Sequence, residues 1–500
     1  MRHKLLYPTL ALLLAVFLHL TCAYDFYYAE QFRVFRWSAD YVVPFFGQIG
    51  GPVSLWTSFL LQFYYLPGVG AVCTAVAFLL MATGTTALLR RIAPKWPLAV
   101  FGVTAGLMQC ALATETHYSL EQSWALIAAV WTLVGIALSW EAAKKFTSKK
   151  AGAIALRTAS IILLVAALLY TCGPVVWGEY YYSTMLHASA HSHWPLATVV
   201  LGILTACILH RRPLPVWLQT EKQRGYFVTA ELLMAIVFGA WYFTQCHTVG
   251  SVRLKQLDYY RTSEQWDNIL DMPDLPTDKI ILYTNYQNLA LAATGRLGEE
   301  FMLRGQTGTF GLQQVWQGAQ FESDLLSDIF MQQGHVAMAQ KMAFTAMQGN
   351  RGMIHGRMML RLIETNLILG ADKVAEKYIN ILSQTLHYKE RAEAYRKFVG
   401  HPELVTQDRR MGELQRCTQG CDWCPNDLEE GLKQIIEANP SYRNALEYLG
   451  CYYMLNNNPE KFKDFLDTYY AYPGLNPMPK SFARAAESLL WHQPRKEESK

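Results

Sequence analysis

Acidic and histidine side chains gather in three short segments of the sequence, and each segment lies between long apolar stretches. Carboxylates and imidazoles exchange protons near neutral pH and bind divalent metals, so these residue types together could support acid–base or metal chemistry. In chain order they are Asp25, Glu30, Asp40, Glu115, His117, Glu121, Glu179, His187, His191 and His193. Such chemistry requires the three segments to meet on one face of the folded chain.

Two subsets of these residues are candidate sites. The candidate catalytic carboxylates are Asp25, Glu30 and Asp40, and the candidate metal ligands are His187, His191 and His193. The first two histidines are four residues apart, so they share one face if their segment is helical. The competing interpretation is a set of solvated loops without chemistry, because any loop that leaves a membrane needs polar residues.

Four cysteines near the C-terminus form another candidate cluster, namely Cys417, Cys421, Cys424 and Cys451. The first three have the C-x3-C-x2-C spacing by which radical S-adenosylmethionine enzymes ligate an iron–sulfur cluster. Those enzymes need a surrounding βα-barrel, and no alternation of strand and helix patterns is present here. We therefore expect two of the four cysteines to form a disulfide that closes a loop between helical hairpins, with a four-cysteine zinc site as the alternative.

The elements that carry the first three segments are predicted to be membrane-spanning helices. A bilayer core about 30 Å thick needs about 20 mostly apolar residues in a helix. Seven stretches qualify, the sixth being the shortest: residues 5–23, 69–89, 97–114, 123–140, 153–172, 195–209 and 226–245. The first stretch also resembles a signal peptide. Residues 54–65, within the loop 24–68, are too few to span and are predicted to form an interfacial helix.

Lysine and arginine are distributed unequally between the two sides of these stretches. If the seven stretches alternate in direction, 13 basic residues lie in the loops of one side and only Arg33 and Arg36 on the other. Positive charge in short loops marks the cytoplasmic side. The N-terminus is therefore predicted in the cytoplasm and the chain after residue 245 outside it. Because topology and anionic lipid account for the basic loops, we expect no nucleic-acid partner.

Two charges lie inside the predicted spans. Arg157 is about four residues into the fifth stretch and Glu231 about five into the seventh, both counted from the cytoplasmic end. At 1.5 Å per residue they reach similar depth, so a pair between them would reduce the cost of burying either charge. We predict this structural pair; the alternative is that Arg157 extends to the headgroups while Glu231 faces water.

The second half of the chain has a different composition. Residues 1–245 carry 25 charged side chains with a net charge of +7, whereas the remaining 255 residues carry 59 with a net charge of −3. Within the predicted domain 246–500, residues 250–495 show a helical period, and Gly334, Ala339, Ala343 and Ala346 recur 36 residues later as Gly370, Ala375, Ile379 and Leu382. A glycine turn followed by small residues at these offsets is typical of tetratricopeptide (TPR) hairpins. The fold class is thus predicted to be all-α, a bundle of about seven spans followed by a TPR-like domain.

Two resemblances follow from this layout. The first half resembles the GT-C superfamily of lipid-linked sugar transferases, with Asp25 just after the first span as the implied base or metal ligand, although no Trp-Trp-Asp signature is present. The whole chain resembles an uncharacterised family of Gram-negative inner-membrane proteins with a C-terminal TPR-like domain. That resemblance rests on the stretches 62–67, 288–292 and 366–370, and it implies a periplasmic C-terminal domain.

Two functions from different classes are compatible with these features. In the first, the protein is anchored in the inner membrane and its periplasmic TPR-like domain offers a surface to a protein or peptide partner, with membrane lipid as the other partner. In the second, the first half is a GT-C-like transferase that uses a lipid-linked sugar at the outer face. No cofactor is expected in the first case, and a divalent metal in the second.

Overall fold

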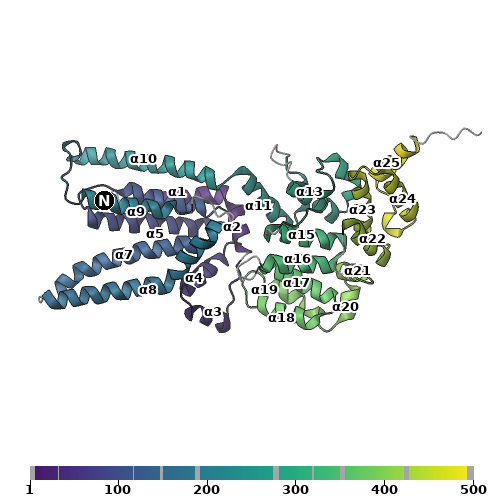
Figure 1. Ribbon diagram of the computed structural model, residues 1–500, viewed down its shortest axis with the longest axis horizontal. Helices are drawn as coiled ribbons and strands as arrows, with labels where there is room; N and C mark the ends of the chain where they lie inside the picture. The colour runs from purple at the N-terminus through teal and green to yellow at the C-terminus, as the bar shows by residue number, and fades with distance from the viewer. Residues whose placement is uncertain are drawn as a thin grey trace, which may run out of the picture. The chain divides into compact units, whose positions relative to one another are not determined.

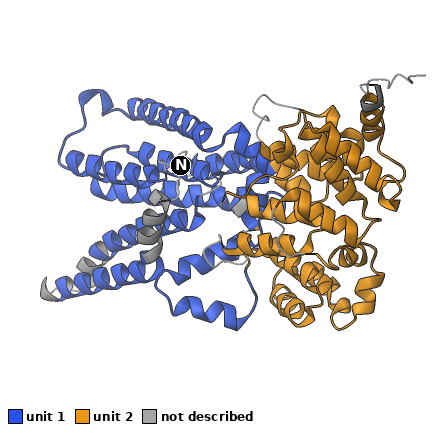
Figure 2. Ribbon diagram, turned by 45° about the vertical axis from the view of Figure 1, so that its right-hand side comes forward, with its two compact units in different colours: residues 1–30, 35–255 blue, residues 31–34, 256–500 orange. Residues whose placement is uncertain are grey.

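The computed structural model describes residues 6–31, 33–115, 118–146, 150–185, 192–273, 281–317, 320–348, 355–421 and 427–491. Every regular element within these ranges is a helix (Figure 1), which confirms the predicted all-α class. The chain divides into two compact units (Figure 2). Unit 1 consists of residues 1–30 and 35–255, and unit 2 of residues 31–34 and 256–500.

Unit 1 is built from helices that follow the apolar stretches of the sequence. They are α1 (Leu6–Thr21), α2 (Ala23–Glu30), α3 (Ala39–Phe46), α4 (Gly51–Leu61), α5 (Val69–Ile92), α6 (Ala99–Leu112), α7 (Leu120–Phe146), α8 (Lys150–Met185), α9 (Trp194–Leu209), α10 (Glu221–Cys246) and the first part of α11 (Val249–Thr262). The boundary between the units lies inside α11, between residues 255 and 256, whereas the sequence placed it at residue 245.

Four helices of unit 1 are long and apolar enough to cross a membrane: α5, α7, α8 and α10. A fifth crossing results if α1 and α2, which meet at an angle of 78°, are one broken span. Helices also occupy the other two predicted ranges, but α6 and α9 have only 14 and 16 residues. The predicted number of seven crossings therefore stays a prediction. Helix α4 covers most of the range 54–65, and its interfacial position stays a prediction.

Helices α5 and α6 form the centre of unit 1. Helix α6 packs against α5, α9 and α10, while α5 also contacts α1 and α7. Small residues allow this close approach, since a Cβ atom at Gly239 of α10 would lie 2.7 Å from Leu107 of α6. Helix α8 pairs with α7 and leaves apolar side chains such as Ile162 and Leu163 more than 60% exposed. The unit therefore has a tight core and an apolar outer surface.

Unit 2 consists of shorter helices that are polar on their exposed faces. After the second part of α11 they are α12 (Trp266–Leu270), α13 (Ile281–Ala293), α14 (Leu297–Glu300), α15 (Gln320–Gln333), α16 (Val336–Gln348), α17 (Gly356–Ile368), α18 (Asp372–Leu382), α19 (Lys389–Ala394), α20 (Pro402–Gln407), α21 (Arg409–Cys417), α22 (Leu428–Ala438), α23 (Arg443–Leu455), α24 (Pro459–Tyr469) and α25 (Lys480–Trp491).

The repeated small-residue pattern lies on two successive hairpins, α15–α16 and α17–α18. Gly334 and Gly370 form the two hairpin turns with φ angles of 91° and 75°, a left-handed conformation that glycine adopts without strain. The six residues that follow them in the pattern are all fully buried on α16 and α18: Ala339, Ala343, Ala346, Ala375, Ile379 and Leu382. These glycines and small residues therefore have equivalent roles in both hairpins.

The later helices do not extend these two hairpins into a simple array. Helix α23 packs against α22 and α24, but it also contacts α14 and α15, which come more than 100 residues earlier. Helix α17 contacts α20 and α21 as well as its hairpin partner α18. Unit 2 therefore curls back on itself, and a TPR-like architecture stays a prediction.

Candidate functional site

Asp25 lies buried in the first turn of α2, directly after the bend that separates α1 from α2. Its Oδ1 accepts a hydrogen bond from Lys255 Nζ at 2.7 Å, and the same ammonium donates to the Thr114 carbonyl at 2.6 Å. Both charged side chains are buried, with 3% of each residue exposed. The carboxylate that the sequence marked as a candidate base therefore already has a cation as its partner.

Cys22 and His247 complete a cluster around Asp25. His247 Nδ1 lies 3.4 Å from Asp25 Oδ2, and the donor atoms of the three residues all lie within 4.8 Å of one another. Burial lowers the pKa of His247 against the opposing effect of Asp25, which favours a neutral imidazole. Thiol, carboxylate and imidazole are metal-binding groups, but the Lys255 ammonium would repel a metal cation at the same carboxylate. The arrangement favours a buried ion pair over a metal centre.

The other two candidate carboxylates have different surroundings. Glu30 is buried at the end of α2. Asp40 is 67% exposed at its side chain on α3, where its Oδ2 lies 3.5 Å from Arg36 Nη1. The three carboxylates thus differ in exposure and partners, and the structure gives no common catalytic arrangement for Asp25 and Asp40.

The histidine cluster lies mostly outside the described residues. His187 and His191 fall in the range 186–191, which the structure does not describe. His193 is described and occupies the N-cap position of α9, before Pro195 in the first turn. His117, from the second polar segment, is also outside the described ranges. The predicted metal site therefore stays a prediction.

Arg157 and Glu231, both in the described part of the chain, do not form the predicted ion pair. Arg157 lies on α8 with its guanidinium carbon 4.4 Å from the ring centroid of Trp140 on α7, a cation–π contact. Glu231 Oε2 is buried on α10 without a hydrogen-bond partner among the described residues. The prediction failed because α8 pairs with α7 while α10 packs against α6, so equal depth does not bring the two helices together.

The predicted C-terminal disulfide is absent among the cysteines that the structure describes. Cys417, Cys421 and Cys451 all remain thiols, and Cys424 lies outside the described ranges. Cys421 Sγ donates to the Cys417 carbonyl at 3.0 Å, and Asn439 Nδ2 donates to Cys417 Sγ at 3.5 Å. Burial raises the pKa of Cys417 to about 12, so this thiol stays protonated and unreactive.

Unit 2 contains a buried charge network that sequence reasoning missed. Arg261 of α11 is 1% exposed and pairs with Asp324 at 2.9 Å and Asp328 at 2.7 Å, both on α15, as well as with Asp258. Gln31, from the short segment 31–34, donates to Asp258 Oδ2 at 3.1 Å. The network thus connects helices that are distant in sequence.

Helix α17 contributes the other half of this network. Arg357 pairs with Asp324 at 2.9 Å and also with Asp328, while Arg361 pairs with Asp328 at 2.7 Å and with Glu364. Although burial raises the pKa of Asp328, the three surrounding guanidiniums lower it well below its usual range. The i, i+4 spacing of Asp324 with Asp328 and of Arg357 with Arg361 was the available signal, because such pairs share one helix face.

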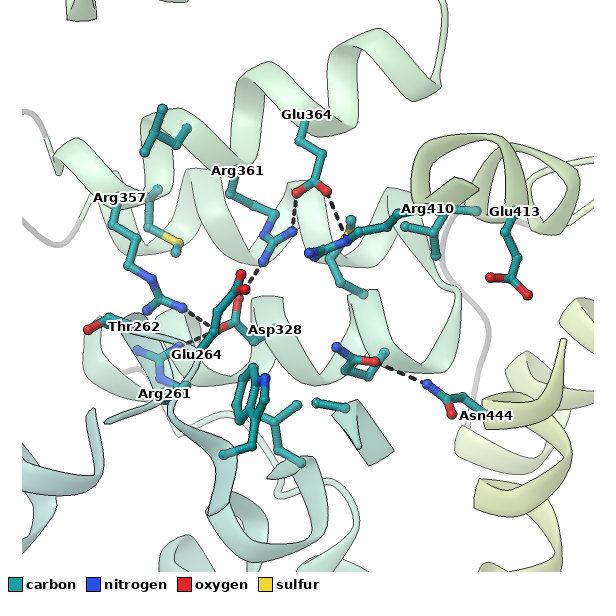
Figure 3. A pocket seen from close by; sticks show the side chains of 18 of the residues that line it. Arg261, Thr262, Glu264, Asp328, Arg357, Arg361, Glu364, Arg410, Glu413 and Asn444 are labelled. Atoms are coloured by element: carbon teal, nitrogen blue, oxygen red, sulfur yellow. Dashed lines mark hydrogen bonds and ion pairs between the residues drawn. The ribbon is translucent and has the colours of Figure 1, made fainter. Parts of the chain in front are cut away.

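A cavity of about 460 Å³ opens beside this network (Figure 3). Its lining comes from α11, α12, α13, α15, α17, α19, α21 and α23, and it includes the aromatic residues Trp266, Tyr395 and Tyr442. Cavities of this size bind small ligands or peptide side chains in other proteins. Because of its volume and its charged and aromatic lining, we take this cavity as the candidate binding site in the described part of the chain.

Six arginines line this cavity, and they differ in how far their charges are satisfied. Arg261, Arg357, Arg361 and Arg410 pair with acids, the last with Glu364 at 3.2 Å. Among the described residues, Arg391 and Arg409 have no carboxylate partner. The guanidiniums of Arg391 and Arg409 are therefore available to donate hydrogen bonds to a ligand.

Two acids that line the cavity are likewise without an ion-pair partner among the described residues, namely Glu264 and Glu413. Glu264 follows the end of α11 with a φ angle of 55°, a left-handed conformation that a residue with a Cβ atom rarely adopts. In Figure 3 its side chain points into the cavity, while Glu413 lies at one edge. Carboxylate acceptors and guanidinium donors are thus both available to a ligand.

A family described as a family of unknown function (DUF6057) matches residues 2–500, nearly the whole chain. No curated protein and no solved structure matches the chain. The match is consistent with the expected uncharacterised family, and it adds no activity to either candidate site.

Proposed function

The chain belongs to this family of unknown function (DUF6057), and we propose that it is a multi-pass inner-membrane protein whose unit 2 binds a protein or peptide partner in the cell envelope. The observation that carries this proposal is the cavity of about 460 Å³, whose lining includes three aromatic side chains and charges of both signs that have no ion-pair partner among the described residues. Ligand-binding cavities combine aromatic side chains with a few polar groups in this way, whereas segments that only connect helices have no need of them on a concave surface.

Anchoring in the membrane is supported by unit 1. Its four long apolar helices and the bent pair α1–α2 have the length and composition of spans, and the outward side chains of α8 are apolar. The basic residues concentrate in the loops of one side if the seven predicted stretches alternate. In this proposal unit 2 lies in the periplasm.

Site-specific photo-crosslinking in the living cell tests the proposed function. p-Benzoylphenylalanine in place of Tyr395, which lines the cavity, should form an adduct of defined mass with an envelope protein or peptide. The same probe in place of Tyr470, which is 66% exposed and outside the cavity, serves as the control. Absence of an adduct that is specific to the Tyr395 probe would contradict the proposal.

A charge variant of the full chain makes this test stricter. Arg409→Glu should reduce the adduct several-fold because it reverses a free charge in the cavity lining, whereas Arg416→Glu should not. Arg416 is exposed on the same helix, α21, and does not line the cavity. Equal adduct yields from both variants would show that the probe reacts with passing proteins and not with a bound partner.

The alternative function, a GT-C-like transferase, has less support. Its implied base, Asp25, is already paired with Lys255, and both side chains are buried. The test is Asp25→Asn with the surface glycans measured at unchanged protein abundance. Loss of a specific glycan would favour the transferase, and unchanged glycans would remove it.

A further inference from the structure

The charges around the cavity balance. Six arginines line it, and four acids line it with them: Glu264, Asp328, Glu364 and Glu413. Two more acids, Asp258 and Asp324, lie directly behind and pair with the lining arginines. The sum is six positive and six negative charges, so the cavity as a whole does not favour a ligand with a large net charge of either sign.

The unsatisfied groups within this balance define what a ligand must offer. Arg391 and Arg409 line the cavity, are exposed and have no carboxylate partner among the described residues, so their guanidiniums can donate to an anionic oxygen of a ligand. The exposed carboxylate of Glu264, which has no ion-pair partner among the described residues, can accept from a cationic donor such as an ammonium. A ligand that carries both groups satisfies both needs and keeps the site neutral.

Neutral amides line the cavity beside these charges. Asn444 Nδ2 donates to Gln332 Oε1 at 3.0 Å, and both residues line the cavity and are half-buried. This pairing leaves the Gln332 Nε2 donor and the Asn444 Oδ1 acceptor available. One donor beside one acceptor is the complement of a peptide group, which offers a carbonyl oxygen and an N–H.

We propose that this cavity binds a short zwitterionic peptide, its carboxylate at the guanidiniums of Arg391 and Arg409, its ammonium at Glu264 and a peptide bond at Gln332 and Asn444. The assignment rests on the proposed function, because it names the class of peptide that unit 2 takes. It also gives a reason for the left-handed conformation of Glu264, since glycine would fit that backbone better but would supply no carboxylate.

The test is isothermal titration of the full chain in lipid nanodiscs with trialanine. Free trialanine should bind saturably, and both the N-acetylated and the C-amidated forms should bind roughly tenfold more weakly or worse, because each lacks one charge-assisted contact. Phosphoethanolamine, which offers an anionic oxygen and an ammonium but no peptide bond, should compete at least about tenfold more weakly than trialanine. No saturable binding of trialanine, equal binding of the blocked forms, or competition by phosphoethanolamine as strong as that of trialanine would each overturn the assignment.

Variants connect the binding to the named residues. Glu264→Gln should weaken free trialanine roughly tenfold and leave the acetylated form unchanged, whereas Glu376→Gln, an exposed acid on α18 outside the cavity, should change neither. Glu264→Gly should weaken binding equally while the thermal unfolding temperature rises or holds, because glycine relieves the backbone. Undiminished binding by Glu264→Gly would overturn the role of this carboxylate.

The outcome is separable from that of the proposed function. A specific adduct at Tyr395 with no preference for free trialanine would keep unit 2 as a partner-binding domain and overturn the zwitterionic ligand. Trialanine binding without any adduct would keep the ligand class and overturn the larger envelope partner.

Discussion

Lys255 Nζ lies 2.7 Å from Asp25 Oδ1 although 230 positions separate the two residues in the sequence. The pair joins α2, the residue Thr114 just beyond α6 and the first part of α11 within unit 1, because the ammonium also reaches the Thr114 carbonyl. A charge buried in this way is stabilised only while its partner is present. Asp25, the candidate base predicted from the sequence, thus forms a structural ion pair with Lys255 in the folded protein.

Removal of one partner of this pair should be strongly destabilising. Lys255→Met leaves the Asp25 carboxylate buried without a cation, and we expect a loss of about 3–5 kcal/mol in the free energy of unfolding. Thermal unfolding of the full chain in detergent measures it, with the exposed Lys373→Met of α18 as the control. The double variant Asp25→Asn, Lys255→Met should recover part of the loss; a double variant as unstable as Lys255→Met alone would show that the pair is not the cause.

The packing of α10 against α6 should depend on Gly239. A Cβ atom there would lie 2.7 Å from Leu107, so Gly239→Ala forces the two helices apart and should cost about 1–3 kcal/mol. A Cβ atom at Gly225, on the same helix, would meet no other atom within 4 Å, so Gly225→Ala should stabilise slightly through helix propensity. Unfolding temperatures that shift alike for both variants would exclude the steric explanation.

Protonation of His355 should weaken unit 2 in acid. This side chain is fully buried and caps α17 by accepting from the Met358 N–H, and burial lowers its pKa from 6.5 to about 4. Between pH 6.5 and about 4, His355 is therefore protonated in the unfolded chain but neutral in the folded chain. The free energy of unfolding consequently falls as the pH falls through this window. Each such group contributes a slope of about 1.4 kcal/mol per pH unit.

His355→Asn isolates this contribution, because asparagine is also a good helix cap. Chemical unfolding at several pH values between 6.5 and 4 should give a shallower loss of stability in the variant, by about one proton. Above pH 7 the two proteins should show the same dependence on pH. Parallel curves throughout the acidic window would contradict a buried neutral His355.

Reporter fusions after residue 500 and after Arg212 should report opposite sides of the membrane. Alkaline phosphatase fused after residue 500 should be active, because it folds in the periplasm, whereas the same enzyme fused after Arg212, in a predicted cytoplasmic loop, should be inactive. Fluorescent protein fusions should give the reverse pattern. Activity at both positions or at neither would mean that the number of crossings between them is even and that the predicted topology is wrong.

The sequence predicted where the helices of this fold lie along the chain better than it predicted which helices pack against one another. Apolar stretches of 15–21 residues are local properties, and helices occupy all seven of them, from α1 to α10. The glycine and small-residue pattern likewise located the turn at Gly334 and the buried face of α16. The pairing of Arg157 with Glu231 failed because depth along a helix does not say which helix lies alongside.

The cavity in unit 2 could not be predicted from the sequence, for a related reason. Arg261, Asp328 and Arg409 come from α11, α15 and α21, and only the curling of unit 2 brings these helices around one cavity. Charged residues spaced four apart indicate that they share one face of a helix, but the spacing does not indicate which other helix that face contacts. Of the four cysteines expected to supply a disulfide, Cys417, Cys421 and Cys451 are free thiols and Cys424 lies outside the described residues.

The inclusion of residues 31–34 in unit 2 has a consequence for how the chain is made. Gln31 donates to Asp258, and the Gly356 N–H donates to the Gln31 carbonyl at 3.1 Å, so a segment near the start of the chain completes a unit whose other residues begin at 256. The ribosome releases this segment more than 200 residues before its partners emerge. Residues 31–34 must therefore wait for the last part of the protein to be synthesised, and unit 2 can be completed only when that part folds around them.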